Sequence, residues 1–198
     1  KDPELFDLEH GYENRFQRFQ DLLRHKVHHI LLASSIYDSF ILAEDGRLHE
    51  SLLTEYMDLN LSDAPSITRV SSGEEAMAML RGETRFDLII TSLGLEDMPG
   101  LDFARKAREA AHNVPIVLLT YDARALNELM ANYDTSVFDR VFIWQGDFRI
   151  LLAIIKSVED RLNLEHDTKL VGVQSIILIE DSVRFYSAYL PIIYTELM

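Results

Sequence analysis

The sequence has no cysteine in its 198 residues. This absence excludes disulfide bonds, thiol catalysis and cysteine-ligated zinc, and it favours a reducing compartment, so we expect a cytoplasmic protein. The sequence also lacks a secretory signal and an apolar run long enough to cross a membrane. Glycine-rich phosphate-binding loops and the Gly-x-Ser-x-Gly elbow are missing too, which excludes the enzyme classes that depend on them.

Basic residues are scarce, with 19 Lys and Arg against 33 Asp and Glu, for a formal net charge of -14. Such a charge repels nucleic-acid phosphates and anionic lipid, so we expect neither nucleic acid nor a membrane as a partner. The hydrophobic fraction of 47% is enough for one core of ordinary size, with residues left over. The chain begins at Lys1 and ends at Met198 within a helical pattern, so we expect a piece of a longer protein.

Short apolar runs alternate with amphipathic helical patterns through most of the sequence. This alternation predicts parallel strands joined by helical crossovers, hence an α/β domain with a doubly wound five-stranded parallel sheet. The order of the strands does not follow from the pattern. The expected strands are residues 29–33, 67–70, 88–90, 116–119 and 141–143, and the expected helices are residues 49–59, 73–80, 101–111, 123–131 and 148–164.

Further elements are expected on both sides of this domain, which we place at residues 28–165. Apolar positions at helical spacing predict an extra N-terminal amphipathic helix, assigned to residues 1–27. Residues 166–174 are expected to be a linker. Residues 175–198 begin with an apolar run at 175–179 and continue with a helical pattern, so they repeat the opening of the domain as a C-terminal βα fragment.

Two segments carry a resemblance to a known family. Residues 87–100, DLIITSLGLEDMPG, and residues 115–120, PIVLLT, resemble the third strand with its loop and the fourth strand of response-regulator receiver domains. The resemblance covers about two thirds of the chain and implies the flavodoxin-like receiver fold. By the same likeness, residues 175–198 resemble the first strand and helix of a second, truncated receiver.

Phosphoryl transfer to a receiver needs an acidic pair for Mg²⁺ after the first strand, an Asp nucleophile after the third, a hydroxyl after the fourth and a Lys after the fifth. At these positions the sequence has Ser34 and Ser35, Ser92, Thr120 and Trp144, and only Thr120 matches. The resemblance therefore implies a degenerate receiver, or pseudo-receiver. Its phosphoacceptor pocket is vestigial, and we expect no enzyme activity, metal or other cofactor in this domain.

A small error of alignment does not restore the missing groups. Residues 22–37 and 88–95 contain no Asp or Glu, and residues 107–155 contain no Lys. A further departure is an insertion of roughly a dozen residues at 36–47, with a turn signal at Asp45-Gly46. Its apolar residues Phe40, Ile41 and Leu42 indicate either a packing insertion or a segment that covers the pocket or contacts a partner.

The leading hypothesis is a phosphorylation-independent regulatory module of a bacterial two-component-type signalling protein, acting through protein contacts. Receivers commonly use a face that corresponds here to residues 123–131, 141–143 and 148–162. The alternative is the regulatory part of a phosphotransfer enzyme, in which Glu180 and Asp181 belong to an active second receiver that binds Mg²⁺. A third hypothesis, from another class, is a small-molecule sensor that uses the vacated pocket.

The expected partners are proteins. The resemblance to receiver domains implies a histidine kinase as one such partner. A looser resemblance, to the regulatory region of bacterial proteins of the pyruvate phosphate dikinase or phosphoenolpyruvate synthase type, implies a catalytic domain downstream in the same chain. A homodimer through residues 175–198, here called the tail, is also expected, because its one strand and one helix would leave apolar side chains uncovered. These side chains are Ile177, Ile179, Phe185, Leu190 and Ile193.

Overall fold

The computed structural model describes residues 22–38, 48–59, 61 and 64–197. Most of the expected N-terminal helix and the greater part of the insertion, including Phe40, Ile41, Leu42 and Asp45-Gly46, lie outside these residues. The contacts divide the chain into two units. One unit comprises Val27–Lys156 with Glu180–Met198, and the other comprises Lys1–Lys26 with Ser157–Ile179.

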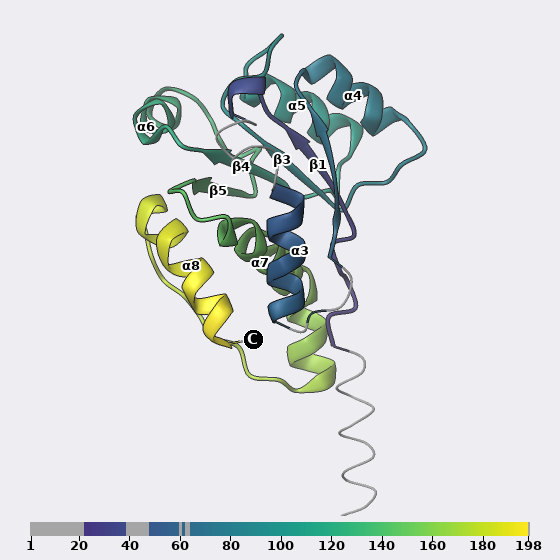
Figure 1. Cartoon of the computed structure of the whole chain (residues 1–198), viewed down its shortest axis with the longest axis vertical. Coiled ribbons are helices and arrows are strands. Elements are labelled where there is room, and N and C mark those ends of the chain that lie inside the picture. Colours follow the sequence, from purple (N-terminus) through teal and green to yellow (C-terminus); the bar gives the residue numbers. More distant parts are fainter. Residues whose placement is uncertain (1–21, 39–47, 60, 62–63, 198) are drawn as a thin grey trace, which may run out of the picture. The chain divides into compact units, whose positions relative to one another are not determined.

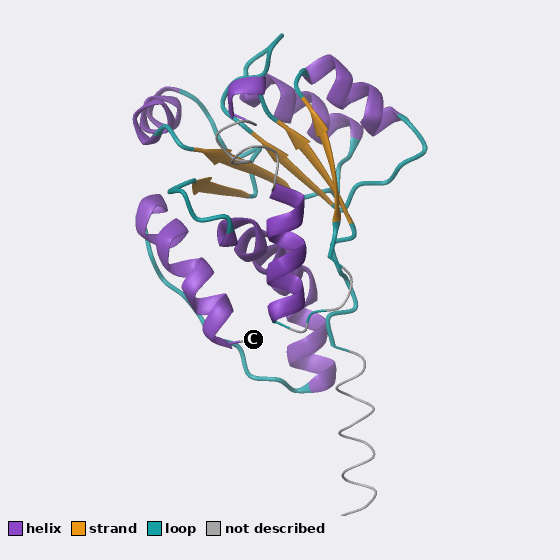
Figure 2. Cartoon of the chain, viewed as in Figure 1, coloured by secondary structure: helices purple, strands orange, loops and turns teal. Residues whose placement is uncertain are grey.

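The larger unit contains a five-stranded sheet in which every neighbouring pair of strands is parallel (Figures 1 and 2). The strand order is β2-β1-β3-β4-β5, the order of flavodoxin-like doubly wound folds. The expected fold class is confirmed, and the structure adds the order. The strands are β1 (His29–Ala33), β2 (Ser66–Val70), β3 (Leu88–Thr91), β4 (Ile116–Thr120) and β5 (Arg140–Ile143).

Helices follow each strand at nearly the expected positions. Figure 1 shows α4, α5 and α6 on one side of the sheet, with α3 and the start of α7 on the other. Side chains alternate between the two faces along a strand, and helices cover both faces of this sheet. The central strands β3 and β4 are therefore buried throughout, and β1 is buried except at His29. The helices are α3 (Leu48–Asp58), α4 (Gly73–Arg81), α5 (Gly100–Ala110), α6 (Ala123–Asn132), α7 (Arg149–His166) and α8 (Val183–Leu197).

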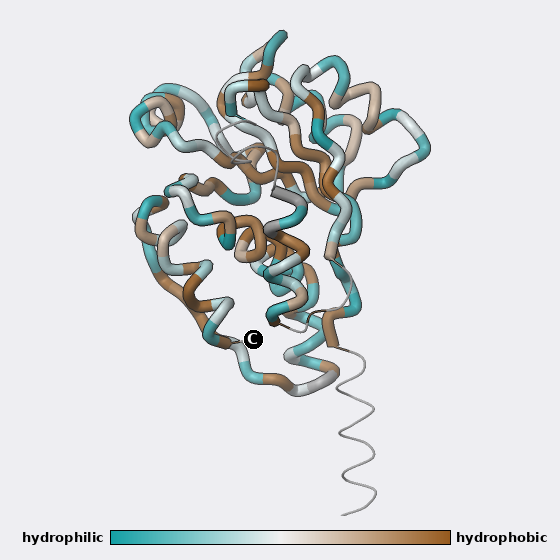
Figure 3. Tube along the Cα trace, viewed as in Figure 1, coloured by the Kyte–Doolittle hydropathy of each residue, from teal (hydrophilic) through white to brown (hydrophobic). Residues whose placement is uncertain are grey.

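The core of the sheet consists of strand side chains that helices cover. Leu31, Ile89 and Leu118, from the three central strands, are fully buried in one cluster with side chains of α4, α5 and α6. Figure 3 shows the central strands among the hydrophobic segments of this unit. Arg108 of α5 connects the segments that lead into β4 and β5. Its guanidinium donates hydrogen bonds to the carbonyls of residues 114 and 137 and to the carboxylate of Asp139, the last at 2.6 Å.

In the smaller unit, the end of the expected N-terminal helix is wrong, because residues 22–26 are not helical. The backbone N–H and carbonyl of His25 pair with the side-chain amide of Asn163, both at 2.8 Å. The N–H of Leu23, whose φ is +53°, donates to a carboxylate oxygen of Asp167 at 3.3 Å. These side chains satisfy backbone groups that a helix would have paired internally.

The expected linker at residues 166–174 is only partly a linker. The helix α7 continues through His166, and a π-helical turn, η1 (Asp167–Val171), follows it. The turn ends at Gly172, which has a φ of +80° and donates its N–H to the carbonyl of Asp167 at 3.0 Å. A left-handed residue of this kind is a usual helix terminator, and glycine adopts it without a steric penalty.

The expected strand at residues 175–179 is also wrong, because these residues form an extended loop with no strand pairing (Figure 2). Ile176, Ile177 and Ile179 are 76%, 81% and 89% exposed. A strand is stable only when a neighbouring strand pairs with its backbone, and within the described residues none lies beside this run. The apolar residues at 175–179 therefore favour a strand, but no neighbouring strand is present among the described residues to pair with them.

The expected helix after residue 182 is confirmed as α8, but its environment is not the expected one. This helix packs against β5 of the first domain. Leu190 is consequently 5% exposed, which corrects the expectation that it would be uncovered, and Ile193 is partly covered. Phe185 is 51% exposed, as the sequence led us to expect.

Candidate functional site

The residues expected to form the pocket all lie at the carboxyl ends of strands, with Thr120 as the last residue of β4 and the others after their strands. The backbone N–H of Ser34 donates to the carbonyl of Val70, the last residue of β2, at 3.0 Å. The N–H of Ser92 donates to the carbonyl of Ala33, the last residue of β1, also at 3.0 Å. The N–H of Trp144 donates to the carbonyl of Thr120 at 2.7 Å. The sheet hydrogen bonding thus extends one residue beyond the strands and holds these four positions at one edge, where ligands bind in open α/β sheets.

These positions are buried and carry no charge. Ser34, Ser92, Thr120 and Trp144 are between 0% and 7% exposed, while Ser35 is partly exposed. Within the part of the chain that the structure describes, no group of three or more His, Asp or Glu side chains is arranged to hold a metal ion. The side chains at these five positions are therefore hydroxyl and indole groups, with no carboxylate or ammonium group among them.

The hydroxyl of Ser92 is used within its own loop. Its Oγ donates to the carbonyl of Gly94 at 2.8 Å, and the N–H of Gly100 donates to the carbonyl of Leu93 at 2.8 Å. A Cβ on Gly100 would overlap the carbonyl oxygen of Ser92. The absence of a side chain at Gly100 therefore lets the start of α5 lie directly against the end of β3.

Two other hydroxyls bind backbone amides. The Oγ of Ser35 accepts a hydrogen bond from the N–H of Asp38 at 3.1 Å. The Oγ1 of Thr120 accepts one from the N–H of Asp122 at 3.0 Å. Each of these hydroxyls, at the ends of β1 and β4, thus accepts a hydrogen bond from a backbone N–H close by in the sequence.

A carboxylate that the sequence did not point to lies near this edge. Burial, the negative charge of Asp38 and a hydrogen bond to its carboxylate raise the pKa of Tyr121 above its usual range. The rings of Tyr37 and Tyr121 meet edge to face, with centroids 6.1 Å apart. The pair joins residues that are 84 positions apart in the sequence, so no local pattern could have indicated it.

Asp97 is a second residue that the sequence did not single out. Its carboxylate, in the loop between β3 and α5, accepts hydrogen bonds from the N–H groups of Gly73 at 2.6 Å and Glu74 at 2.9 Å. These bonds to the first turn of α4 lower the pKa of Asp97. The carboxylate thus caps α4 from a distance and fixes the loop that follows Ser92.

The acidic pair expected in a second receiver lies just before α8. A carboxylate oxygen of Glu180 accepts a hydrogen bond from the N–H of Ser182 at 2.9 Å, and Asp181 is exposed. Residues 175–179, directly before the pair, do not form a strand. In this arrangement Glu180 closes a turn at the start of α8.

The fold assigns this chain to the flavodoxin-like class of doubly wound α/β proteins. A sequence model of the response regulator receiver domain matches residues 40–142. The chain therefore belongs to the response regulator receiver family. No curated protein sequence matches it.

Solved structures of similar fold also come from response-regulator proteins. One is the signal receiver domain of an HD domain-containing protein from Pseudomonas fluorescens Pf-5, with a TM-score of 0.54, 18% identity, and coverage of 72% of this chain and 94% of that one. Another is a putative response regulator from Chloroflexus aurantiacus J-10-fl, with a TM-score of 0.50, 19% identity, and coverage of 69% and 100%.

A third solved structure belongs to a streptococcal family of redox sensors described as evolved from two-component response regulators. Its TM-score is 0.53 at 20% identity, and the alignment covers 79% of this chain and 59% of that one. At these identities the likeness concerns the fold. Separately, none of the described helices is long and apolar enough to span a bilayer.

Proposed function

We propose that this receiver domain is a regulatory, protein-binding module that works without phosphorylation in a bacterial two-component-type pathway. The observation that supports the proposal is the set of residues at the strand ends. Ser34 and Ser35, Ser92 and Trp144 stand where a phosphorylatable receiver needs its acidic pair, nucleophile and Lys. Hydrogen bonds to neighbouring strands fix three of these positions, so no shift in register supplies the missing charges.

The chemistry of these side chains also argues against phosphoryl acceptance. An Asp acceptor attacks as a carboxylate, whereas the Ser92 hydroxyl would need a base, and it already donates to the carbonyl of Gly94. The transferring group also loses the positive charges that normally offset it. We therefore propose that the domain is not an enzyme and needs no Mg²⁺.

The test is incubation with acetyl phosphate and Mg²⁺, followed by intact-protein mass spectrometry, with a phosphorylatable receiver treated in parallel. We expect no mass gain in this chain and a gain of one phosphoryl group in the control. A stoichiometric, hydroxylamine-labile gain in this chain would refute the proposal. In that case, loss of the gain in Asp38→Asn would identify Asp38, the carboxylate beside Tyr121, as the acceptor.

A second candidate function places the active phosphoacceptor in a second receiver, with Mg²⁺ at Glu180 and Asp181. Its support is the acidic pair directly after the apolar run at residues 175–179. The structure has these residues as a loop, so this candidate requires that they pair as a strand in a longer product. Treating a longer gene product with acetyl phosphate and comparing it with its Asp181→Asn variant would test it.

Several partner assignments belong to the same proposal. We propose that the partners are proteins, either a histidine kinase or a catalytic domain of the same chain, and that the protein acts in the cytoplasm. A homodimer through the tail also stays a proposal. Phe185, Tyr189 and Ile192 recur along the outer side of α8 and are 49–51% exposed, so they are the surface that a second copy would cover.

A further inference from the structure

The outer edge of β5 carries a backbone donor that α8 satisfies. Since β5 ends the sheet, its outward N–H groups have no partner strand. The N–H of Ile143 donates to the Oγ of Ser187 at 2.9 Å, and the same Oγ donates to the carbonyl of Val183 at 2.7 Å. Ser187 is 3% exposed, so this hydroxyl replaces water at the edge of the sheet.

Other contacts fix the register of α8 on β5. The ring of Tyr186 lies 5.6 Å from that of Phe142, and the guanidinium of Arg140 lies 5.6 Å from the centroid of the same Tyr186 ring. The side-chain amide of Gln145 donates to the carbonyl of Arg184 at 2.9 Å. The contact of α8 with this surface therefore depends on a hydroxyl in the first third of the helix and on the aromatic ring directly before it.

The fit between α8 and this surface is incomplete. A cavity of about 190 Å³, open to solvent on one side, remains between the helix and the domain, and its volume is enough for several waters. Polar side chains of the loop after β5 form part of its wall, so the side chains of α8 and of the domain do not fill this part of the contact. The cavity is lined by Ile143, Gln145, Asp147, Ile150, Ser187, Ala188 and Pro191.

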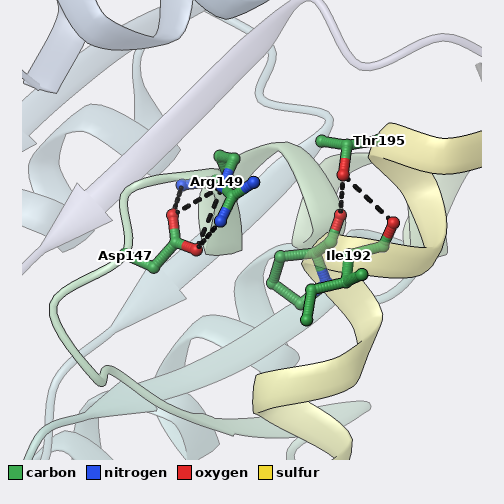
Figure 4. A network of polar contacts seen from close by, with 5 residues as sticks. Asp147, Arg149, Ile192 and Thr195 are labelled. Atoms are coloured by element: carbon green, nitrogen blue, oxygen red, sulfur yellow. Dashed lines mark hydrogen bonds and ion pairs between the residues drawn. The ribbon is translucent and has the colours of Figure 1, made fainter.

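The helix α8 is also intrinsically weak. Pro191 lies inside it and has no N–H for the carbonyl four residues earlier, an interruption that costs about 3 kcal/mol in a helix interior. The hydroxyl of Thr195 donates to the carbonyls of Pro191 and Ile192, both at 3.0 Å (Figure 4). A helix of only 15 residues is marginal by itself in water, so the helical state of α8 depends on its docking to β5.

We propose that the outer edge of β5, with the start of α7, is a helix-binding surface that α8 occupies within the same chain. A partner helix binds there when α8 leaves, so α8 acts as a competitor built into the chain. The partner that fits is an amphipathic helix with a hydroxyl residue in its first third and an aromatic residue directly before that hydroxyl residue. This inference rests on the proposed function as a protein-binding module and adds how that binding is controlled.

The competition can be measured with a peptide of residues 183–197, labelled with a fluorophore and extended with lysines for solubility. Its anisotropy is titrated with the full chain and with a Ser187→Ala, Leu190→Ala variant, which removes a hydrogen bond and a buried side chain from the tethered α8. We expect the variant to bind the peptide at least about tenfold more tightly, because its surface is more often free. Tyr189→Ala, on the exposed side of α8, should bind like the unaltered chain.

If the peptide binds in the place of α8, its affinity depends on the same contacts that α8 makes with β5. A peptide with Ser187→Ala should bind the released variant more weakly, because the N–H of Ile143 then lacks its acceptor. The proposal would be overturned if the unaltered chain and the Ser187→Ala, Leu190→Ala variant bound the peptide with equal affinity. It would also be overturned if the double variant did not bind the peptide. If the double variant loses its native circular dichroism, Ser187→Ala alone is used, with an intermediate affinity expected and the same outcomes decisive.

The two proposals fail separately. Phosphoryl uptake from acetyl phosphate would refute phosphorylation independence and leave the peptide competition unaffected. Failure of the competition would remove the control by α8 and leave the absence of phosphoryl chemistry untouched.

Discussion

Replacing Gly100 with alanine tests how tightly the site loop is built. The new Cβ would overlap the carbonyl oxygen of Ser92, a backbone atom next to β3. Neighbouring hydrogen bonds restrain both segments, including that from the Gly100 N–H to Leu93, so the strain cannot be relieved by rotating a side chain. Overpacking of this kind usually costs about 1–3 kcal/mol, and we expect the upper end, about 3 kcal/mol.

The measurement is thermal and urea unfolding followed by far-ultraviolet circular dichroism. For a protein of this size about 3 kcal/mol corresponds to a fall in Tm of roughly 6–12 °C. Gly94→Ala in the same loop is the matched control, because a Cβ there would meet no atom within 4 Å. A loss below about 1 kcal/mol for Gly100→Ala, or an equal loss for Gly94→Ala, would show that the close approach is not a constraint.

Three further predictions concern other parts of the chain. Arg108→Ala removes hydrogen bonds to several backbone carbonyls and a carboxylate, so urea unfolding should show a loss of about 2 kcal/mol, whereas Arg105→Ala, in an exposed ion pair of 3.7 Å, should change stability by less than about 0.5 kcal/mol. Burial opposes ionisation of Asp147, but hydrogen bonds and the charge of Arg149 outweigh it and lower its pKa. The stabilisation is therefore present above the unfolded pKa near 3.8 and is lost as the pH falls, so Asp147→Asn should be less stable at neutral pH and lose less on acidification; equal pH profiles would contradict this. If the tail forms a homodimer, Phe185→Ser should lower the mass measured by light scattering at tens of micromolar, and a monomeric unaltered chain would rule the dimer out.

The sheet was predictable because its central strands are buried on both faces. The apolar run at residues 29–33 coincides with β1, and the other four strands differ from expectation by one residue at one end. Helices that pack on this sheet show the same agreement, since the hydrophobic pattern records burial directly. Strand order was not predictable, because it depends on which edges meet in space.

The errors fall where tertiary contacts decide the local structure. Residues 22–26 have helical periodicity, yet the side chains of Asn163 and Asp167 bind their backbone instead. Residues 175–179 have the composition of a strand but no neighbouring strand. In each case a segment distant in sequence, or the lack of one, decided the outcome.

The candidate site was predictable in position and only partly in detail. The hydroxyl and indole residues after the strands were identified because the ends of parallel strands share one edge. The cap that Asp97 places on α4 and the contact between Asp38 and Tyr121 were not identified. Both join loops across the sheet, and their residue types are common on any protein surface.

The hydroxyl groups at the carboxyl ends of the strands also determine which interactions stabilise this end of the sheet. Carboxylates gathered at one site repel one another, and their repulsion falls when a divalent cation binds. Ser92 and Thr120 instead complete hydrogen bonds within their own loops, so no like charges oppose folding at these positions. We therefore expect the stability of this end of the sheet not to depend on the divalent cation concentration, because its buried hydroxyls are held by internal hydrogen bonds, as in a protein core.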